Sequence, residues 1–220
     1  MKLTGEQLDY LALHLESKKV CQWDLKQELL DHLATSIEGE MENNGTNFID
    51  AFEMESDKWH NELQPFSNMS LGNSIKVPKI VLMRYLTIVR TMYLKTLALN
   101  LPIVGMLYLV LNSEFLNIEP LYPILGIVYL FILLTILLFY FKMTQQRLST
   151  IPNGIFKATM GYYSAWLLVF NPLLTKLYWV FQDGQLISAF LFINVFLLCF
   201  SINFIRLFKT HVKVLKMNSI

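Results

Sequence analysis

Residues suited to acid–base chemistry first occur together at Asp31 and His32, within the stretch ELLDHLATSIEGEMENNG. A histidine beside a carboxylate is a common general base. The same region places an apolar residue at every fourth position from Leu25 to Ile37, which predicts a helix that buries one face. Asp31 and His32 lie at the polar edge of that face. We therefore expect them, with Glu38, to contribute to protein recognition rather than to catalysis.

The remaining candidates for chemistry are scattered. His14, His32 and His60 do not stand at helical metal-ligand spacing, and the chain has neither H-E-x-x-H nor C-x-x-C. Cys21 has no histidine near it in the sequence, and no G-x-S-x-G, phosphate-binding loop or dinucleotide glycine pattern occurs. These absences predict no catalytic residue, no metal and no cofactor. An enzyme whose site leaves no sequence signature stays as the weakest alternative.

Charge divides the chain into two chemically different parts. Residues 1–64 hold 14 acidic and 5 basic side chains, whereas residues 65–220 hold 3 acidic and 13 basic ones. An acidic domain repels phosphate backbones, so we expect no nucleic-acid binding there. The N-terminus lacks the apolar core of a signal peptide, and two distant cysteines predict no disulfide framework.

The second part contains four apolar runs, each near the 20 residues that a helix needs to cross the hydrocarbon core. The predicted spans are 94–112, 120–141, 158–181 and 186–205. Open sheet edges are not tolerated in lipid, and the runs lack the alternation of barrel strands, so they predict helices. The fold class we expect is all-α, with a small three-helix cytoplasmic domain followed by a four-helix transmembrane bundle.

Basic residues give these spans a predicted orientation. Twelve of the 13 basic residues in this part precede or open the first span, lie between the second and third, or follow the fourth. The positive-inside rule then places both termini in the cytoplasm and the protein in the cell inner membrane. The exception is Lys176, near the outer end of the third span, for which we expect snorkelling or ion pairing. Asn100, Asn171 and Asn194 are the other polar residues singled out within spans, where interhelical hydrogen bonds are their common role.

Two segments connect the acidic domain to the spans. Residues 65–78 are rich in Pro, Ser, Asn and Gly and predict a linker. Residues 79–93 form an amphipathic pattern whose basic face continues one turn further. Such a helix suits the membrane surface, with its cations toward anionic head groups. A cytoplasmic extension of the first span, packed on the acidic domain, is the equal alternative. The basic residues of this face are Lys79, Arg84, Arg90 and Lys95. Residues 206–220 form a basic cytoplasmic tail.

Three predicted helices fill the acidic domain, and Gly45 marks the turn between the second and third. The E-L-L-D-H motif, the Ile37–Glu38 pair, Gly45 and the D-A-F motif beginning at Asp50 together resemble the HAAS domain and the related permease-prefix domains of bacterial membrane proteins. The resemblance covers residues 4–63 and none of the spans. It implies a cytoplasmic signalling or regulatory module without catalytic residues.

These observations favour a non-enzymatic, multi-pass membrane protein whose acidic domain binds a cytoplasmic regulator, a membrane permease or a second copy of itself. The alternative is an accessory subunit of a transport or efflux assembly. A secondary carrier is disfavoured because no Asp or Glu lies within any predicted span. The opposite charges of the two parts also predict that the acidic domain docks electrostatically on the basic helix at 79–93.

Overall fold

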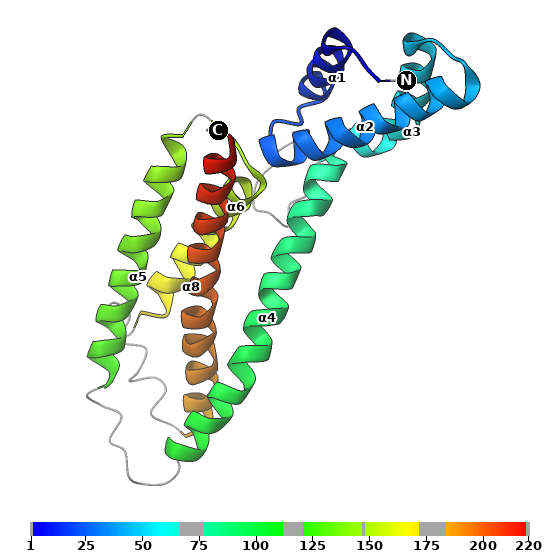
Figure 1. Ribbon diagram of the computed structural model, residues 1–220. Coiled ribbons are helices and arrows are strands. Elements are labelled where there is room, and N and C mark those ends of the chain that lie inside the picture. Colours follow the sequence, from blue (N-terminus) through cyan, green and yellow to red (C-terminus); the bar gives the residue numbers. More distant parts are fainter. Residues whose placement is uncertain (1, 67–76, 112–120, 147, 172–183, 219–220) are drawn as a thin grey trace.

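The computed structural model describes residues 2–66, 77–111, 121–146, 148–171 and 184–218. Helices account for most of these residues, so the all-α prediction is confirmed. Figure 1 shows a small helical domain at one end of a second group of helices, with the C-terminus at that same end.

Helices α1, α2 and α3 form the N-terminal domain. Their bounds are Gly5–Ser17, Trp23–Asn44 and Phe48–Leu63. Thr4 and Gln7 form a reciprocal capping box at the start of α1. Gly45 ends α2 with a φ of 63°, a left-handed conformation that suits glycine, and the Asn47 side chain caps α3. These three boundaries therefore follow from local signals in the sequence.

The core of this domain is the apolar seam predicted for α2. Leu25, Leu29, Leu33 and Ile37 are all at most 4% exposed. They pack with buried residues of α1 and α3, among them Leu11, Leu15, Ala51 and Phe52. The chain then forms a short antiparallel pair between β1 (Pro65–Phe66) and β2 (Val77–Pro78), in the region predicted as a linker.

Four further helices follow, which we call the long helices because the first and last of them have 33 and 35 residues. They are α4 (Lys79–Leu111), α5 (Leu121–Thr144), α6 (Ile151–Val169) and α8 (Gly184–Asn218). Residues 79–93 and the first predicted span, as far as Leu111, belong to one uninterrupted helix, α4. The segment 79–93 is therefore an extension of the first predicted span rather than a separate helix. Similarly, residues 206–218 of the predicted tail continue α8.

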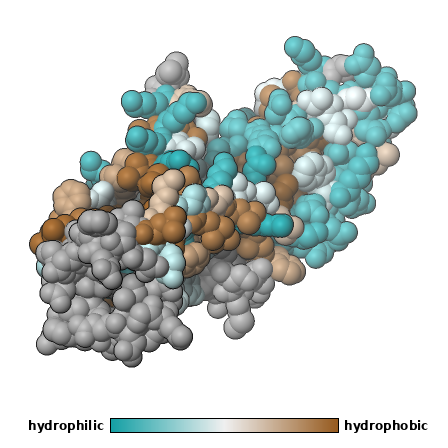
Figure 2. Space-filling model, turned by 90° about the horizontal axis from the view of Figure 1, so that it is seen from below, coloured by the Kyte–Doolittle hydropathy of each residue, from teal (hydrophilic) through white to brown (hydrophobic). Residues whose placement is uncertain are grey.

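The described residues contain three helices that are long and apolar enough to cross a membrane, rather than the four we predicted. They are Lys79–Leu109, Pro123–Thr144 and Phe192–Met217. The predicted third span, 158–181, begins within α6, which ends at Val169, and most of its remainder lies outside the described residues together with Lys176. Phe131 and Met106 are each 70% exposed, and Figure 2 shows apolar residues over the long helices and polar residues over the N-terminal domain. Apolar surface of this kind indicates contact with lipid, which supports a membrane protein.

Buried polar side chains join the long helices to one another. Asn203 on α8 donates to the Thr96 hydroxyl on α4 at 2.9 Å, and the Tyr129 hydroxyl on α5 donates to Asn194 Oδ1 on α8 at 2.6 Å. The amide of Asn100 donates to the backbone oxygen of Phe192 at 3.2 Å. Such bonds satisfy groups that would be costly to leave unpaired away from water.

A further bond of this kind connects α5 to the end of α6. The Asn171 side chain donates to the backbone oxygen of Gly126 at 3.3 Å. Asn100, Asn171 and Asn194 are all buried, and each of them takes part in an interhelical hydrogen bond.

Candidate functional site at the domain junction

The N-terminal domain meets the long helices at a set of contacts that we call the docking interface. Its members are the pairs Gln22–Tyr85, Trp23–Ser149, Asp24–Ile151, Glu28–Arg84 and Glu62–Lys79. They bring α2 and α3 against the beginnings of α4 and α6. The contacts are of four kinds, which differ in burial and in expected strength.

Two ion pairs form the solvent-facing part of the docking interface. Lys79 Nζ lies 2.7 Å from Glu62 Oε1, and an Arg84 guanidinium nitrogen lies 3.0 Å from Glu28 Oε2. All four side chains are about half exposed. Pairs in such positions contribute from nothing to about 1 kcal/mol each. They therefore orient the acidic domain on the basic helix more than they hold it there.

A contact that we expect to be stronger than the two ion pairs is made at the start of α6. Thr150 is the N-cap of this helix and accepts a hydrogen bond from the backbone N–H of Asn153. The next unpaired N–H, that of Ile151, donates to both carboxylate oxygens of Asp24, at 2.9 and 3.2 Å. Free N–H groups and the helix dipole make a helix start favourable for a negative charge. Asp24, at the start of α2, thus completes the cap of a helix 127 positions further along the chain.

A backbone contact and a buried side-chain contact flank this cap. The N–H of Trp23 donates to the carbonyl of Ser149 at 2.8 Å, which ties the first turn of α2 to the loop before α6. The buried Gln22 amide donates to the Tyr85 hydroxyl at 3.1 Å. Tyr85 in turn lies against Gly154, where an added Cβ would come within 1.8 Å of the hydroxyl oxygen. Glycine at this position therefore makes room for the tyrosine.

Beside the docking interface lies a polar cluster formed by Gln146, Thr150 and His211. His211 is fully buried, and its Nδ1 and Nε2 lie 2.7 Å from the Thr150 hydroxyl and 2.6 Å from Gln146 Oε1. Nε2 is placed to donate to Gln146 Oε1, and in the tautomer protonated at Nε2 alone the ring accepts from the Thr150 hydroxyl through Nδ1. The cluster links the end of α8 to the helix start that Asp24 caps.

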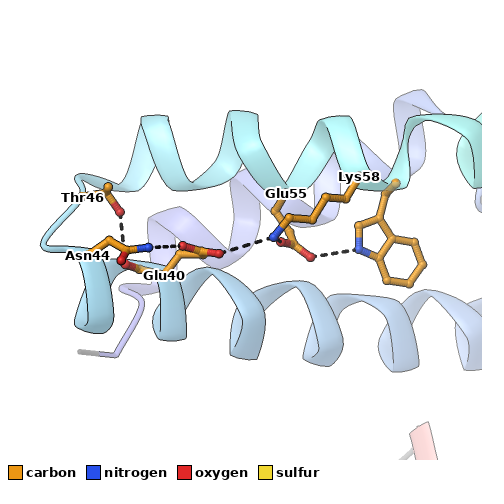
Figure 3. A network of polar contacts seen from close by, with 6 residues as sticks. Glu40, Asn44, Thr46, Glu55 and Lys58 are labelled. Atoms are coloured by element: carbon orange, nitrogen blue, oxygen red, sulfur yellow. Dashed lines mark hydrogen bonds and ion pairs between the residues drawn. The ribbon is translucent and has the colours of Figure 1, made fainter.

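A second polar network holds α2 and α3 together (Figure 3). Glu55 on α3 is 5% exposed and accepts hydrogen bonds from Lys58 Nζ at 2.9 Å and from Trp59 Nε1 at 3.3 Å. Lys58 also reaches Glu40 on α2 at 3.4 Å. Burial acts to raise the pKa of the Glu55 carboxyl, but hydrogen bonds from Lys58, Ser36 and Trp59 and the Lys58 charge outweigh it, so the net pKa is lowered.

The recognition residues predicted on α2 lie apart from the docking interface. Asp31 and His32 are exposed, so their side chains are accessible to a partner. Glu38 instead accepts a hydrogen bond from the backbone N–H of Leu3 at 2.8 Å and holds the N-terminal segment on α2. This contact gives Glu38 a structural role in the domain.

The histidines are found in separate environments. His14 packs edge-on against Phe52, with ring centroids 5.0 Å apart, and burial together with the nearby Lys18 charge lowers its pKa. The His60 ring lies 2.9 Å from the Gln64 amide nitrogen. Within the described parts of the chain, no three histidine, cysteine or acidic side chains come together in a way that would hold a metal ion.

The basic residues predicted to face the membrane surface divide into two groups. Lys79 and Arg84 pair with acids of the N-terminal domain, as described above. Arg90 and Lys95 lie further along α4 and are exposed. The sequence predicted the electrostatic attraction but not Asp24, Tyr85 or the polar cluster. The local sequence signal that could have revealed this helix start is Pro152, in the first turn of α6.

No protein-family model, curated protein or solved structure matches this chain. The class that the fold itself defines is a mostly helical protein in which the described residues include three helices able to cross a membrane, with a polar three-helix domain docked at one end of them.

Proposed function

We propose that this protein is a non-enzymatic membrane protein whose acidic domain is a regulatory module held at the cytoplasmic face by the docking interface. The observation that carries the proposal is the cap that Asp24 provides for α6, because it couples the position of the domain to the start of a helix in the other half. A partner that binds α2 can then shift the docked population and alter α6. The HAAS resemblance of residues 4–63 supports the same role.

The proposal includes four crossings and two cytoplasmic termini in the cell inner membrane. The starts of α4 and α6 and the ends of α5 and α8 lie at the same end of the structure (Figure 1). Lys142 and Lys157 are exposed near this end of α5 and α6, and Lys209 and Lys213 are exposed near the end of α8. The positive-inside rule assigns such an end to the cytoplasm. In this topology, the third crossing consists of α6 and the residues that follow it.

Cysteine labelling tests the topology. Cys21 is exposed, so a Cys199→Ser variant reports on the N-terminal domain alone. A second variant, Cys21→Ser with Cys199→Ser and Ser113→Cys, reports on the predicted outer loop. A membrane-impermeant maleimide should label residue 113 in intact cells, and Cys21 only in inverted vesicles. Labelling of Cys21 in intact cells would rule out the cytoplasmic placement.

Partner recovery tests the regulatory role. The tagged full chain is cross-linked in native membranes and purified in mild detergent. The variant His32→Ala and a control variant, Glu53→Gln, at an exposed position on α3, are treated in the same way in parallel. A soluble regulator or a second copy that is lost with His32→Ala but retained with Glu53→Gln supports the proposal. Recovery of a large permease that is indifferent to His32 favours the alternative, an accessory subunit of a transport assembly.

A further inference from the structure

A groove with both polar and apolar lining residues lies between α4 and α8, apart from the docking interface. It has a volume of about 250 Å³. Its lining combines the apolar side chains of Ile88, Met92 and Leu207 with two cations, three threonines and an asparagine. The charged and polar residues are Thr87, Thr91, Lys95, Asn203, Arg206 and Thr210. We call it the basic groove.

The two cations of the basic groove have no carboxylate partner among the described residues. Lys95 comes from α4 and Arg206 from α8, and both are exposed. By contrast, Lys79 and Arg84, nearer the start of α4, are neutralised by Glu62 and Glu28 of the acidic domain. The basic groove therefore retains a positive charge that the acidic domain does not compensate, and it is complementary to an anion.

The threonine hydroxyls do not donate to that anion, because each already donates within its own helix. Thr91 donates to the backbone oxygen of Thr87 at 2.8 Å, and Thr210 donates to that of Arg206 at 2.9 Å. Thr87 likewise donates to the preceding turn of its own helix. Since their protons are engaged, the hydroxyls give a polar lining without free donors. Recognition of an anion then depends on Lys95 and Arg206.

The level of the basic groove along the helices indicates what kind of anion it accepts. One turn beyond Lys95 in α4 is Leu99, which is 48% exposed, and one turn before Arg206 in α8 is Ile202, which is 43% exposed. Residues four apart share a helix face, and the two helices run in opposite directions (Figure 1). Both apolar side chains therefore lie on the membrane side of the cations. The surface is basic at one level and apolar one turn deeper, as a phospholipid is anionic at the head and apolar in its chains.

We propose that the basic groove is a binding site for one anionic glycerophospholipid, whose phosphodiester lies between Lys95 and Arg206 and whose acyl chains lie along Leu99 and Ile202. Basic pockets between membrane helices on the cytoplasmic side are suited to such head groups. The site joins α4 to α8 at the boundary between the polar and apolar parts of both helices. Its occupancy does not depend on any partner of the acidic domain.

Native mass spectrometry of the full chain in mild detergent tests this site, with phosphatidylglycerol and phosphatidylcholine as the titrated lipids. Wild type should bind the first phosphatidylglycerol more tightly than phosphatidylcholine. Lys95→Gln and Arg206→Gln should each weaken phosphatidylglycerol binding roughly fivefold, and together roughly 30-fold, given the usual contribution of one cation near a membrane surface. The conservative variant Lys95→Arg with Arg206→Lys should bind as wild type does.

A charge-matched control removes two exposed cations elsewhere, by Lys142→Gln with Lys157→Gln on α5 and α6. This variant should retain the affinity for phosphatidylglycerol. An equal loss in the control would overturn the discrete site in favour of diffuse attraction. Inorganic phosphate and glycerol phosphate form the third arm, and affinities equal to that of the lipid would show a site for free phosphate instead. Melting temperatures measured without lipid show whether each variant is folded. If the double variant is not folded, the two single substitutions test the site.

Discussion

The cap that Asp24 provides for α6 leads to a quantitative prediction for Asp24→Ala. The substitution removes a charged acceptor from the Ile151 N–H, to which it is bonded at 2.9 and 3.2 Å. Losing a helix cap costs about 0.5–2 kcal/mol, and hydrogen bonds to charged groups contribute about 1.5–3 kcal/mol. Asp24 is partly exposed, so we take about 2 kcal/mol, which corresponds to a roughly 30-fold fall in the docking equilibrium.

Hydrogen exchange of the full chain in lipid nanodiscs measures this effect directly. The peptide that covers the start of α6 should exchange roughly 30-fold faster in Asp24→Ala, and by a smaller factor in Asp24→Asn, which keeps an oxygen acceptor but loses the charge. Asp31→Ala is the matched control, since Asp31 is an exposed acid on the same helix and outside the docking interface. Equal exchange at the start of α6 in Asp24→Ala and Asp31→Ala would refute the coupling of the domain to this helix.

Three further predictions concern the domain and the docking interface. Glu55→Gln should destabilise the domain by about 1–2 kcal/mol at neutral pH. Because the folded-state pKa of Glu55 is lowered, this loss of stability should vanish as pH falls through that pKa. Denaturant titrations that give the same loss at every pH would contradict this prediction. Gly154→Ala should displace Tyr85, lower the free energy of unfolding by about 1–3 kcal/mol and speed hydrogen exchange at the start of α6. Gly161→Ala in the same helix meets open space and should change neither quantity. Leu29→Ala should cost about 2–5 kcal/mol in thermal unfolding because Leu29 is 3% exposed, while exposed His32→Ala should leave the melting temperature unchanged, and equal effects would argue against the proposed core.

The sequence was most informative where structure depends on neighbouring residues. The cap at Thr4, the turn at Gly45 and the buried seam from Leu25 to Ile37 all follow from signals within a few positions. The docking interface shows the limit of such reasoning. The charge contrast predicted that the two parts attract, but nothing near Asp24 indicates that its carboxylate meets the N–H of Ile151.

Helix ends in the apolar part were predicted less well, for a physical reason. Hydropathy reports where a helix leaves lipid, whereas a helix ends only where its backbone groups find other partners. Residues 206–218 carry several cations and yet continue α8, and residues 79–93 are amphipathic and yet continue directly into the first span. The basic groove was missed for the same reason, because Lys95 and Arg206 become neighbours only when α4 and α8 extend past the apolar boundary together.

The hydrogen bond between Asp24 and Ile151 also sets the order of assembly during synthesis. The two residues are 127 positions apart, and the ribosome adds roughly 5–20 residues per second. Asp24 therefore emerges roughly 6–25 s before the amide that it will cap. By the end of that interval the acidic domain and the start of α4 are both present, but the helix start that Asp24 caps is not. The nascent chain can therefore form the ion pairs with α4 first, and the Asp24 carboxylate stays open to other donors until α6 arrives.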